Sequence, residues 1–163
     1  AHVTWRVQAS MNDHLRGLDA AIARAQSASN HLTDAIRDLS RALGRSPSER
    51  EIAERLRMTV DEYRSLLIEL ADAGVARLGL MNFDRVDETA PADGRQGAWR
   101  RGVFNLLCDA IDDLPPRMHQ ILLLHHQENL PLEEIATLVS MPYARVVELY
   151  TEAVHRLRAA IKR

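Results

Sequence analysis

The sequence is poor in the residue types on which secreted and membrane proteins depend. Its one cysteine, Cys108, excludes an internal disulfide and predicts a reducing, cytoplasmic location. Only two Trp, three Tyr and two Phe are present, and no apolar run approaches the roughly 18 residues of a membrane span. No signal-peptide pattern is visible. A disulfide-rich secreted domain and a membrane protein are therefore not expected.

Patterns typical of catalytic and metal sites are also missing. The sequence has no Gly-rich phosphate loop and no catalytic-triad pattern. His125 and His126 are adjacent, so on a helix they point about 100° apart and do not share a face. Cys108 has no flanking base or cation, which favours a buried core thiol over a nucleophile. We predict no enzyme activity, no cofactor and no metal site.

Positive charge is in short supply as well. The formal net charge is −2, with eleven basic and eleven acidic residues in 1–80 and six basic and eight acidic residues in 109–163. A strong, non-specific nucleic-acid binder needs a broad positive field. Any DNA contact must therefore come from a local basic patch.

What the sequence has is aliphatic helix-forming residues: it is 46% hydrophobic, mostly through Leu, Ala, Val and Ile. This favours an all-α fold. One or two helices are predicted over 15–43, with a stop at Gly44. Their candidate core positions are Leu18, Ile22, Leu32, Ile36, Leu39 and Leu43.

Two capping-box patterns predict the short helices that follow. Ser46 precedes Pro47 and Glu49, and Thr59 precedes Glu62, so each polar residue can cap a helix that the following glutamate reinforces. The two helices are expected to meet near Met58 and to end around 73–74. Residues 1–80 are thus predicted to form a first helical domain.

Periodicity disappears from 82 to 97, which predicts a linker over residues 81–99 between two small helical domains. In the second domain, 100–163, an apolar stripe stops at Pro115 and Pro116. Shorter helices follow over 117–124 and 131–139, and a final helix over 143–161. The expected core positions of the last two are Leu132, Ile135, Leu138, Val146, Leu149, Ala153 and Leu157. A short helix, a tight turn and a longer helix suit a helix-turn-helix, but periodicity alone equally permits an ordinary helical hairpin.

The motifs and their order resemble a known family. Residues 37–47 and 51–56 resemble the third region of bacterial RNA polymerase sigma factors, and 110–117 resembles the start of the fourth region. Residues 132–158 look like its helix-turn-helix, which in the family reads the −35 element. Residues 11–18 are similar to the end of the second region in the flagellar and sporulation branch. The remainder of that second region would lie before Ala1.

The resemblance implies RNA polymerase core, promoter DNA and an anti-sigma protein as partners. It implies that DNA is contacted by Tyr143, Ala144, Arg145, Glu148, Thr151 and Arg156. Several surface positions depart from the family pattern. Pro142 stands where a small polar cap is usual, Ser140 replaces the turn glycine, and two carboxylates, Glu148 and Glu152, lie on a face meant for phosphates.

Two hypotheses follow. In the first, the protein is a sigma factor, or part of one, with weakened −35 reading. In the second, it is a sigma-derived interaction protein that binds an anti-sigma protein or another helical partner without promoter recognition. Val147 and Tyr150 are apolar for an exposed recognition face, which favours protein contact.

Overall fold

The structure, a computed structural model, describes residues 2–76 and 96–162, with side chains from 16–76 and 102–162. Every regular element in the described ranges is a helix and none is a strand, so the all-α prediction is confirmed. No helix within these ranges is long and apolar enough to cross a membrane. The predicted linker falls largely on residues 77–95, outside the described part.

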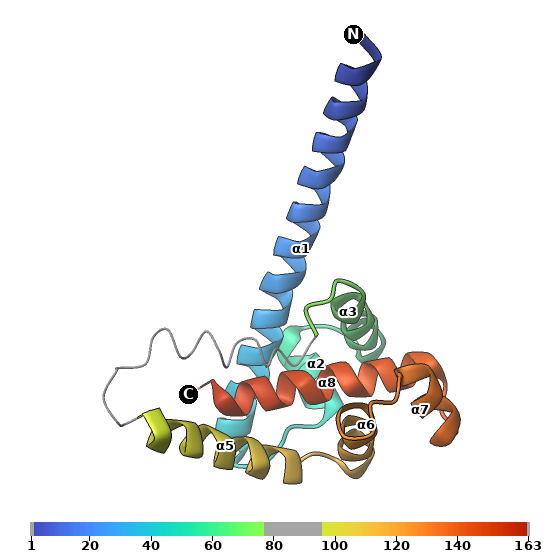
Figure 1. The fold of residues 1–163 in the computed structure, drawn as a ribbon. Helices are drawn as coiled ribbons and strands as arrows, with labels where there is room; N and C mark the ends of the chain where they lie inside the picture. The colour runs from blue at the N-terminus through green and yellow to red at the C-terminus, as the bar shows by residue number, and fades with distance from the viewer. Residues whose placement is uncertain (1, 77–95, 163) are drawn as a thin grey trace.

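The first three helices are α1 (His2–Leu43), α2 (Glu49–Leu56) and α3 (Val60–Asp72). α1 ends as predicted at Gly44, which adopts a positive φ of 65° and donates its N–H to the Ser40 carbonyl at 3.0 Å. The N-terminal part of α1 extends well beyond the other helices (Figure 1). Leu18 and Ile22 were therefore wrongly predicted as core: they are 46% and 51% exposed. Leu43 is also exposed, at the end of α1.

The capping prediction is confirmed at one helix and corrected at the other. Thr59 caps α3, and the Glu62 carboxylate accepts from the Thr59 N–H at 2.7 Å. At α2 the N-cap is Ser48 and not Ser46, with Glu51 completing the box. Ser46 and Pro47 stay in the turn, because Ser48 has the extended backbone that a cap needs and is followed three residues later by a glutamate. This shift frees the Ser46 hydroxyl for another contact.

The second group comprises α5 (Gln96–Asp112), α6 (Pro116–His126), α7 (Leu132–Leu138) and α8 (Tyr143–Ile161). The predicted break at Pro115 and Pro116 is confirmed, since α6 starts with Pro116 in its first turn. Leu138 was expected to be buried but is 64% exposed. It is the last residue of a two-turn helix, where the chain has begun to turn away from the core. The core of this group is formed mainly by Ile121, Leu122, Ile135, Val146, Leu149, Ala153 and Leu157.

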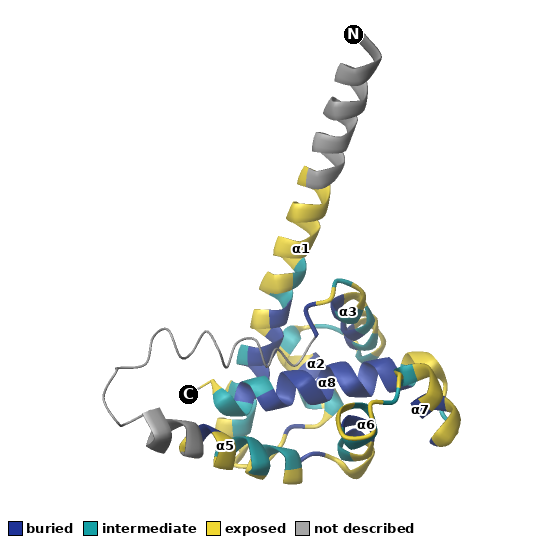
Figure 2. Ribbon diagram, viewed as in Figure 1, coloured by how far each residue is buried: buried dark blue, intermediate teal, exposed yellow. Residues whose placement is uncertain are grey.

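α8 packs against both groups. It contacts α5, α6 and α7 along one side and α1 and α3 along another, and it lies between them in Figure 1. Ala159 of α8 belongs to the core that Leu32, Ile36, Tyr63 and Leu67 form in the first group. As a result almost the whole of α8 is buried from Val146 to Leu157 (Figure 2). We call residues 16–76 the first unit and residues 102–162 the second unit.

Candidate nucleic-acid interface

α7, the turn and α8 have the arrangement of a helix-turn-helix. Ser140 has a positive φ of 53°, the backbone conformation for which glycine is preferred. The chain then returns through a hydrogen bond of 3.0 Å from the Met141 N–H to the Ala136 carbonyl. Pro142 precedes α8 and makes no side-chain capping bond, as the sequence predicted. The turn therefore aligns α8 without the polar cap that the family pattern has.

The N-terminal turn of α8 is the accessible part of the helix. Tyr143 is 50% exposed, Ala144 is exposed, and Arg145 is partly buried. In a helix-turn-helix protein the first residues of the second helix contact base edges. These side chains thus form the candidate DNA-reading end of α8.

Arg145 is bound to carboxylates from both units. Its Nη1 lies 2.7 Å from Glu148 Oε2 on α8 and 3.0 Å from Glu49 Oε1 at the start of α2. Arg64 of α3 also bonds to Glu49, at 2.9 Å. The hydrogen bond from Arg64 lowers the pKa of Glu49, burial opposes this, and Arg145 lowers it further. Burial disfavours the charge of Arg145, but the bonds to Glu148 and Glu49 outweigh it and raise the pKa of Arg145.

Arg156, predicted from the resemblance to contact DNA, is 8% exposed and has its guanidinium occupied. It donates to Glu152 Oε1 at 2.5 Å on its own helix. It also donates to the Ser46 hydroxyl and, at 2.7 Å, to the Pro47 carbonyl in the turn between α1 and α2. Glu152 is buried as the partner of Arg156. In this conformation neither side chain is available to phosphates.

Near its C-terminal end, α8 is joined to α1 and to the segment after α3 by hydrogen bonds of His155 and Arg158. His155 Nδ1 lies 2.7 Å from the Thr151 carbonyl, which can only accept, so Nδ1 carries the proton and Nε2 accepts from Ser29 Oγ at 2.9 Å. Arg158 donates to the Val75 carbonyl at 2.7 Å and to Ser29 Oγ at 3.3 Å. Burial lowers the pKa of His155 to about 4, and the charge of Arg158 acts in the same direction.

Three further residues of the predicted site are also covered. Val147 and Tyr150, expected to be exposed, are 5% and 9% exposed, and Thr151 is fully buried. Tyr150 belongs to the core of the second unit, where its hydroxyl lies 3.2 Å from His126 Nε2. The expectation of exposure was wrong because it treated α8 as having one buried face. Whether these residues contact DNA or a partner remains a prediction.

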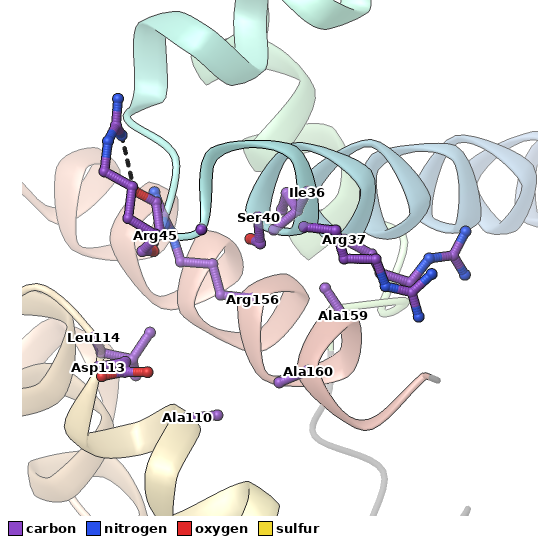
Figure 3. Close-up of a pocket in the computed structure, with 13 residues that line it drawn as sticks. Ile36, Arg37, Ser40, Arg45, Ala110, Asp113, Leu114, Arg156, Ala159 and Ala160 are labelled. Carbon is purple, nitrogen blue, oxygen red and sulfur yellow. Dashed lines mark hydrogen bonds between the residues drawn. The ribbon is translucent and has the colours of Figure 1, made fainter.

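A cavity of about 490 Å³ separates the end of α1 from the end of α5, beside α8 (Figure 3). Several arginines line it, which suggests an anion site, but Arg37, Arg45 and Arg156 each pair with a carboxylate of the chain. Arg37 pairs with Asp34 at 3.0 Å and extends away from the cavity, and Arg45 pairs with Glu51 at 2.6 Å. The cavity is a crevice between the units.

Two sequence models of a known family match these units. That for Sigma-70 region 3 covers residues 27–72, and that for Sigma-70 region 4 covers residues 110–159, which includes α7, the turn and most of α8. The chain belongs to the sigma-70 family. It is a sigma-factor-like regulator of transcription initiation, and the resemblance inferred from the motifs is confirmed.

Similar proteins are of the flagellar type. The chain is 29% identical over 171 residues to the RNA polymerase sigma factor FliA of Salmonella typhimurium, covering 98% of this chain and 70% of the relative. It is 28% identical to FliA of Pseudomonas aeruginosa, covering 96% and 66%. A solved structure of the flagellar sigma/anti-sigma complex Sigma-28/FlgM is similar at 23% identity and a TM-score of 0.49, covering 96% of this chain and 69% of that one.

Sequence reasoning missed the residues of the first unit that contact α8. Ser29, Ser46 and Glu49 meet its polar side chains, yet each has an ordinary local explanation in the sequence. Ser46 looked like a cap and Glu49 like the acid of a capping box. Only the spatial contact of the units reveals their second role.

Proposed function

We propose that the chain directs RNA polymerase core to promoters by reading the −35 element with the N-terminal part of α8. The observation that carries the proposal is the helix-turn-helix of α7 and α8 inside the region 4 match, with Tyr143 and Ala144 exposed at its reading end. Helices placed in this way enter the major groove.

The predicted DNA-binding residues then take different roles. Arg145 is the principal donor to a base or phosphate, and Tyr143 and Ala144 supply apolar contact. Glu148 can accept from a cytosine amino group but repels phosphates. Thr151 and Arg156 lie farther along α8 and reach the backbone only when α8 is free of the first unit. Because Glu148 neutralises Arg145, we expect weak binding by the chain alone.

The test is a titration of a labelled duplex carrying a flagellar-type −35 element, followed by fluorescence anisotropy at several salt concentrations. Specific binding should exceed that of a scrambled duplex and should fall with salt. Arg145→Ala should weaken specific binding by about 1–3 kcal/mol, the range for a good base contact. Arg117→Ala is a matched control, because Arg117 is exposed on α6, where it hydrogen-bonds to Gln120. Equal binding to both duplexes would overturn the proposal.

The second candidate is an interaction protein that keeps the sigma fold and binds an anti-sigma protein or another helical partner in place of DNA. The pairing of Glu148 with Arg145 favours this second candidate, since the carboxylate lies beside the arginine that would contact DNA and would repel phosphates. In that case Val147 would become a contact once α8 is released from the first unit, whereas Tyr150 would stay in the core of the second unit. Val147→Asp would then weaken the partner complex. Calorimetry with an anti-sigma protein and with polymerase core, beside the duplex titration, separates the two candidates.

A further inference from the structure

An apolar surface surrounds the turn between α7 and α8, at the candidate DNA-reading end of α8. Exposed residues lie on α7 and in the turn that follows it (Figure 2). Three large apolar side chains are exposed in the described part of the second unit, and two of them, Leu138 and Tyr143, flank this turn at 64% and 50% exposure. Pro142 and Ala144 beside them are also exposed. We call Leu138, Pro142, Tyr143 and Ala144 the apolar tip.

The polar groups next to the apolar tip are engaged within the chain. The Thr137 hydroxyl donates to the Glu133 carbonyl of its own helix at 3.3 Å. The Tyr143 hydroxyl lies beside the Glu133 carboxylate, and burial and then the charge of Glu133 raise the pKa of Tyr143. Recognition of a guanine or adenine edge uses a side chain with two hydrogen-bonding groups, such as arginine or asparagine. No member of the apolar tip is of that kind, so the tip needs another feature of DNA to contact.

One base edge in the major groove offers an apolar group. Thymine carries its C5 methyl there, whereas adenine, guanine and cytosine present hydrogen-bonding groups. The first residues of the second helix contact base edges in a helix-turn-helix protein, and Tyr143 is the first residue of α8. We infer that the apolar tip selects thymine methyl groups in the −35 element, with Tyr143 as the principal contact. The inference rests on the function proposed above and names the class of base that this site selects.

This selection is compatible with the ion pairs of Arg145. Its Nη1 is bonded to Glu148 at 2.7 Å and to Glu49 at 3.0 Å, so one guanidinium nitrogen that could contact a base is shared by two carboxylates. Contact with a methyl group needs no free donor. A preference for thymine therefore does not require Arg145 to leave its carboxylates.

Replacement of thymine by uracil tests the inference, because it removes the methyl group and keeps the base pair with adenine. The full chain is titrated by fluorescence anisotropy with the −35 duplex, with the same duplex carrying uracil in the element, and with one carrying uracil only outside the element. We expect uracil in the element to weaken binding about fourfold for each methyl in contact, the change that burial of one methyl corresponds to. Uracil outside the element should leave the affinity unchanged.

Salt gives a second readout. The affinity for every duplex should fall as the salt concentration rises, but the ratio between the thymine and uracil duplexes should stay constant, because both carry the same phosphates.

A pair of variants assigns the contact to Tyr143. Tyr143→Ser removes the aromatic ring and should abolish the difference between the thymine and uracil duplexes. Phe104→Ser is the matched control and should keep that difference, because Phe104 is 64% exposed on α5, well away from α7 in Figure 1. Circular dichroism verifies that both variants keep their helices.

Equal binding of the thymine and uracil duplexes, by a chain that prefers the −35 duplex to a scrambled one, would overturn the inference and leave the proposed function intact. A loss on uracil substitution that persists in Tyr143→Ser would also overturn it, because the inference places Tyr143 at the methyl groups. Failure to prefer the −35 duplex to the scrambled one would instead overturn the proposed function, and the selection of thymine with it.

Discussion

At the level of single residues, several polar side chains on the buried part of α8 bond to other helices and turns. Arg156 is the clearest case, with a carboxylate, a hydroxyl and a carbonyl around one guanidinium. A buried arginine that is paired with a carboxylate and hydrogen-bonded through each of its nitrogens is stable in place, whereas removal of the carboxylate leaves an uncompensated charge. Such residues stabilise the arrangement of helices and contact DNA only if that arrangement changes.

His155 provides a prediction about pH. Its pKa is about 4 in the folded protein, because burial disfavours the charged ring, against about 6.5 in the unfolded chain. Between these values the unfolded state binds more protons, so the free energy of unfolding should fall as the pH drops from about 6.5 towards 4, by up to roughly 3 kcal/mol. Above that window the histidine is neutral in both states and has no effect.

Urea unfolding at a series of pH values measures this dependence. His155→Gln should flatten the slope in the window, since glutamine can still meet Ser29 but does not titrate. His31→Gln is the control, because His31 is an exposed histidine on α1. An unchanged slope in His155→Gln would show that other groups cause it.

At the level of helices, the ends and crossings can be tested separately. Ser48→Ala should lose roughly 1 kcal/mol of stability, because the Glu51 N–H loses the Ser48 hydroxyl that accepts its hydrogen bond, while the backbone N–H of residue 48 can still donate to the Glu51 carboxylate. Arg50→Ala is the control, since Arg50 is exposed on the same helix and pairs with Glu54, which is also exposed. Chemical denaturation of both variants measures the difference. An effect no larger than that of the control would place the cap elsewhere.

The crossing of α7 and α8 gives another prediction. Ile135 is fully buried and Leu149 is 7% exposed, so substitution of either by Ala should leave a cavity and lose about 2–5 kcal/mol. Leu138→Ala should change stability by less than about 0.5 kcal/mol, because Leu138 is exposed at the end of α7. Equilibrium denaturation measures the three losses. Equal losses at all three positions would contradict the assignment of Ile135 and Leu149 to the buried face and of Leu138 to the exposed one.

The sequence predicts the helices better than their surroundings. Apolar spacing places α8 correctly and identifies Val146, Leu149 and Ala153 as core, since that stripe packs within the second unit. It fails at Leu18 and Ile22, whose spacing is equally regular but which lie on the extended part of α1. Periodicity reports which face of a helix is apolar, and it does not report whether another element reaches that face.

At the level of the whole molecule, one helix joins the two units. The sequence could not predict this docking, because the charged face of α8 also looks like an ordinary solvent-exposed or DNA-reading face. Ser29 contacts His155 and Glu49 contacts Arg145, and each pair is separated by more than ninety residues of sequence. Patterns of neighbouring residues do not predict contacts over such separations. The contact of the candidate residues with DNA therefore stays a prediction, and the burial of Glu148, Thr151 and Arg156 was not foreseen.

A shared helix also predicts cooperative unfolding. Because α8 contributes to both cores, the described units should unfold in one calorimetric transition. Leu67→Ala in the first unit and Ile121→Ala in the second should each lower the midpoint of that single transition, since both side chains are fully buried. Ser29→Trp, which places a bulky side chain where α1 contacts His155 of α8, should weaken the contact between the units and divide the transition into two. Two transitions in the unmodified chain would contradict the prediction.

The position of α8 as the last described helix has a consequence for synthesis. A nascent chain folds from its N-terminus as it leaves the ribosome, but here the first unit meets its covering helix only after more than sixty further residues have been made. Until then Ser29, Glu49 and Ala53 belong to an incomplete structure whose apolar neighbours are open to solvent and to chaperones. Contacts between distant segments also form slowly. Final folding of the first unit should therefore follow translation of α8 and not accompany translation of α3.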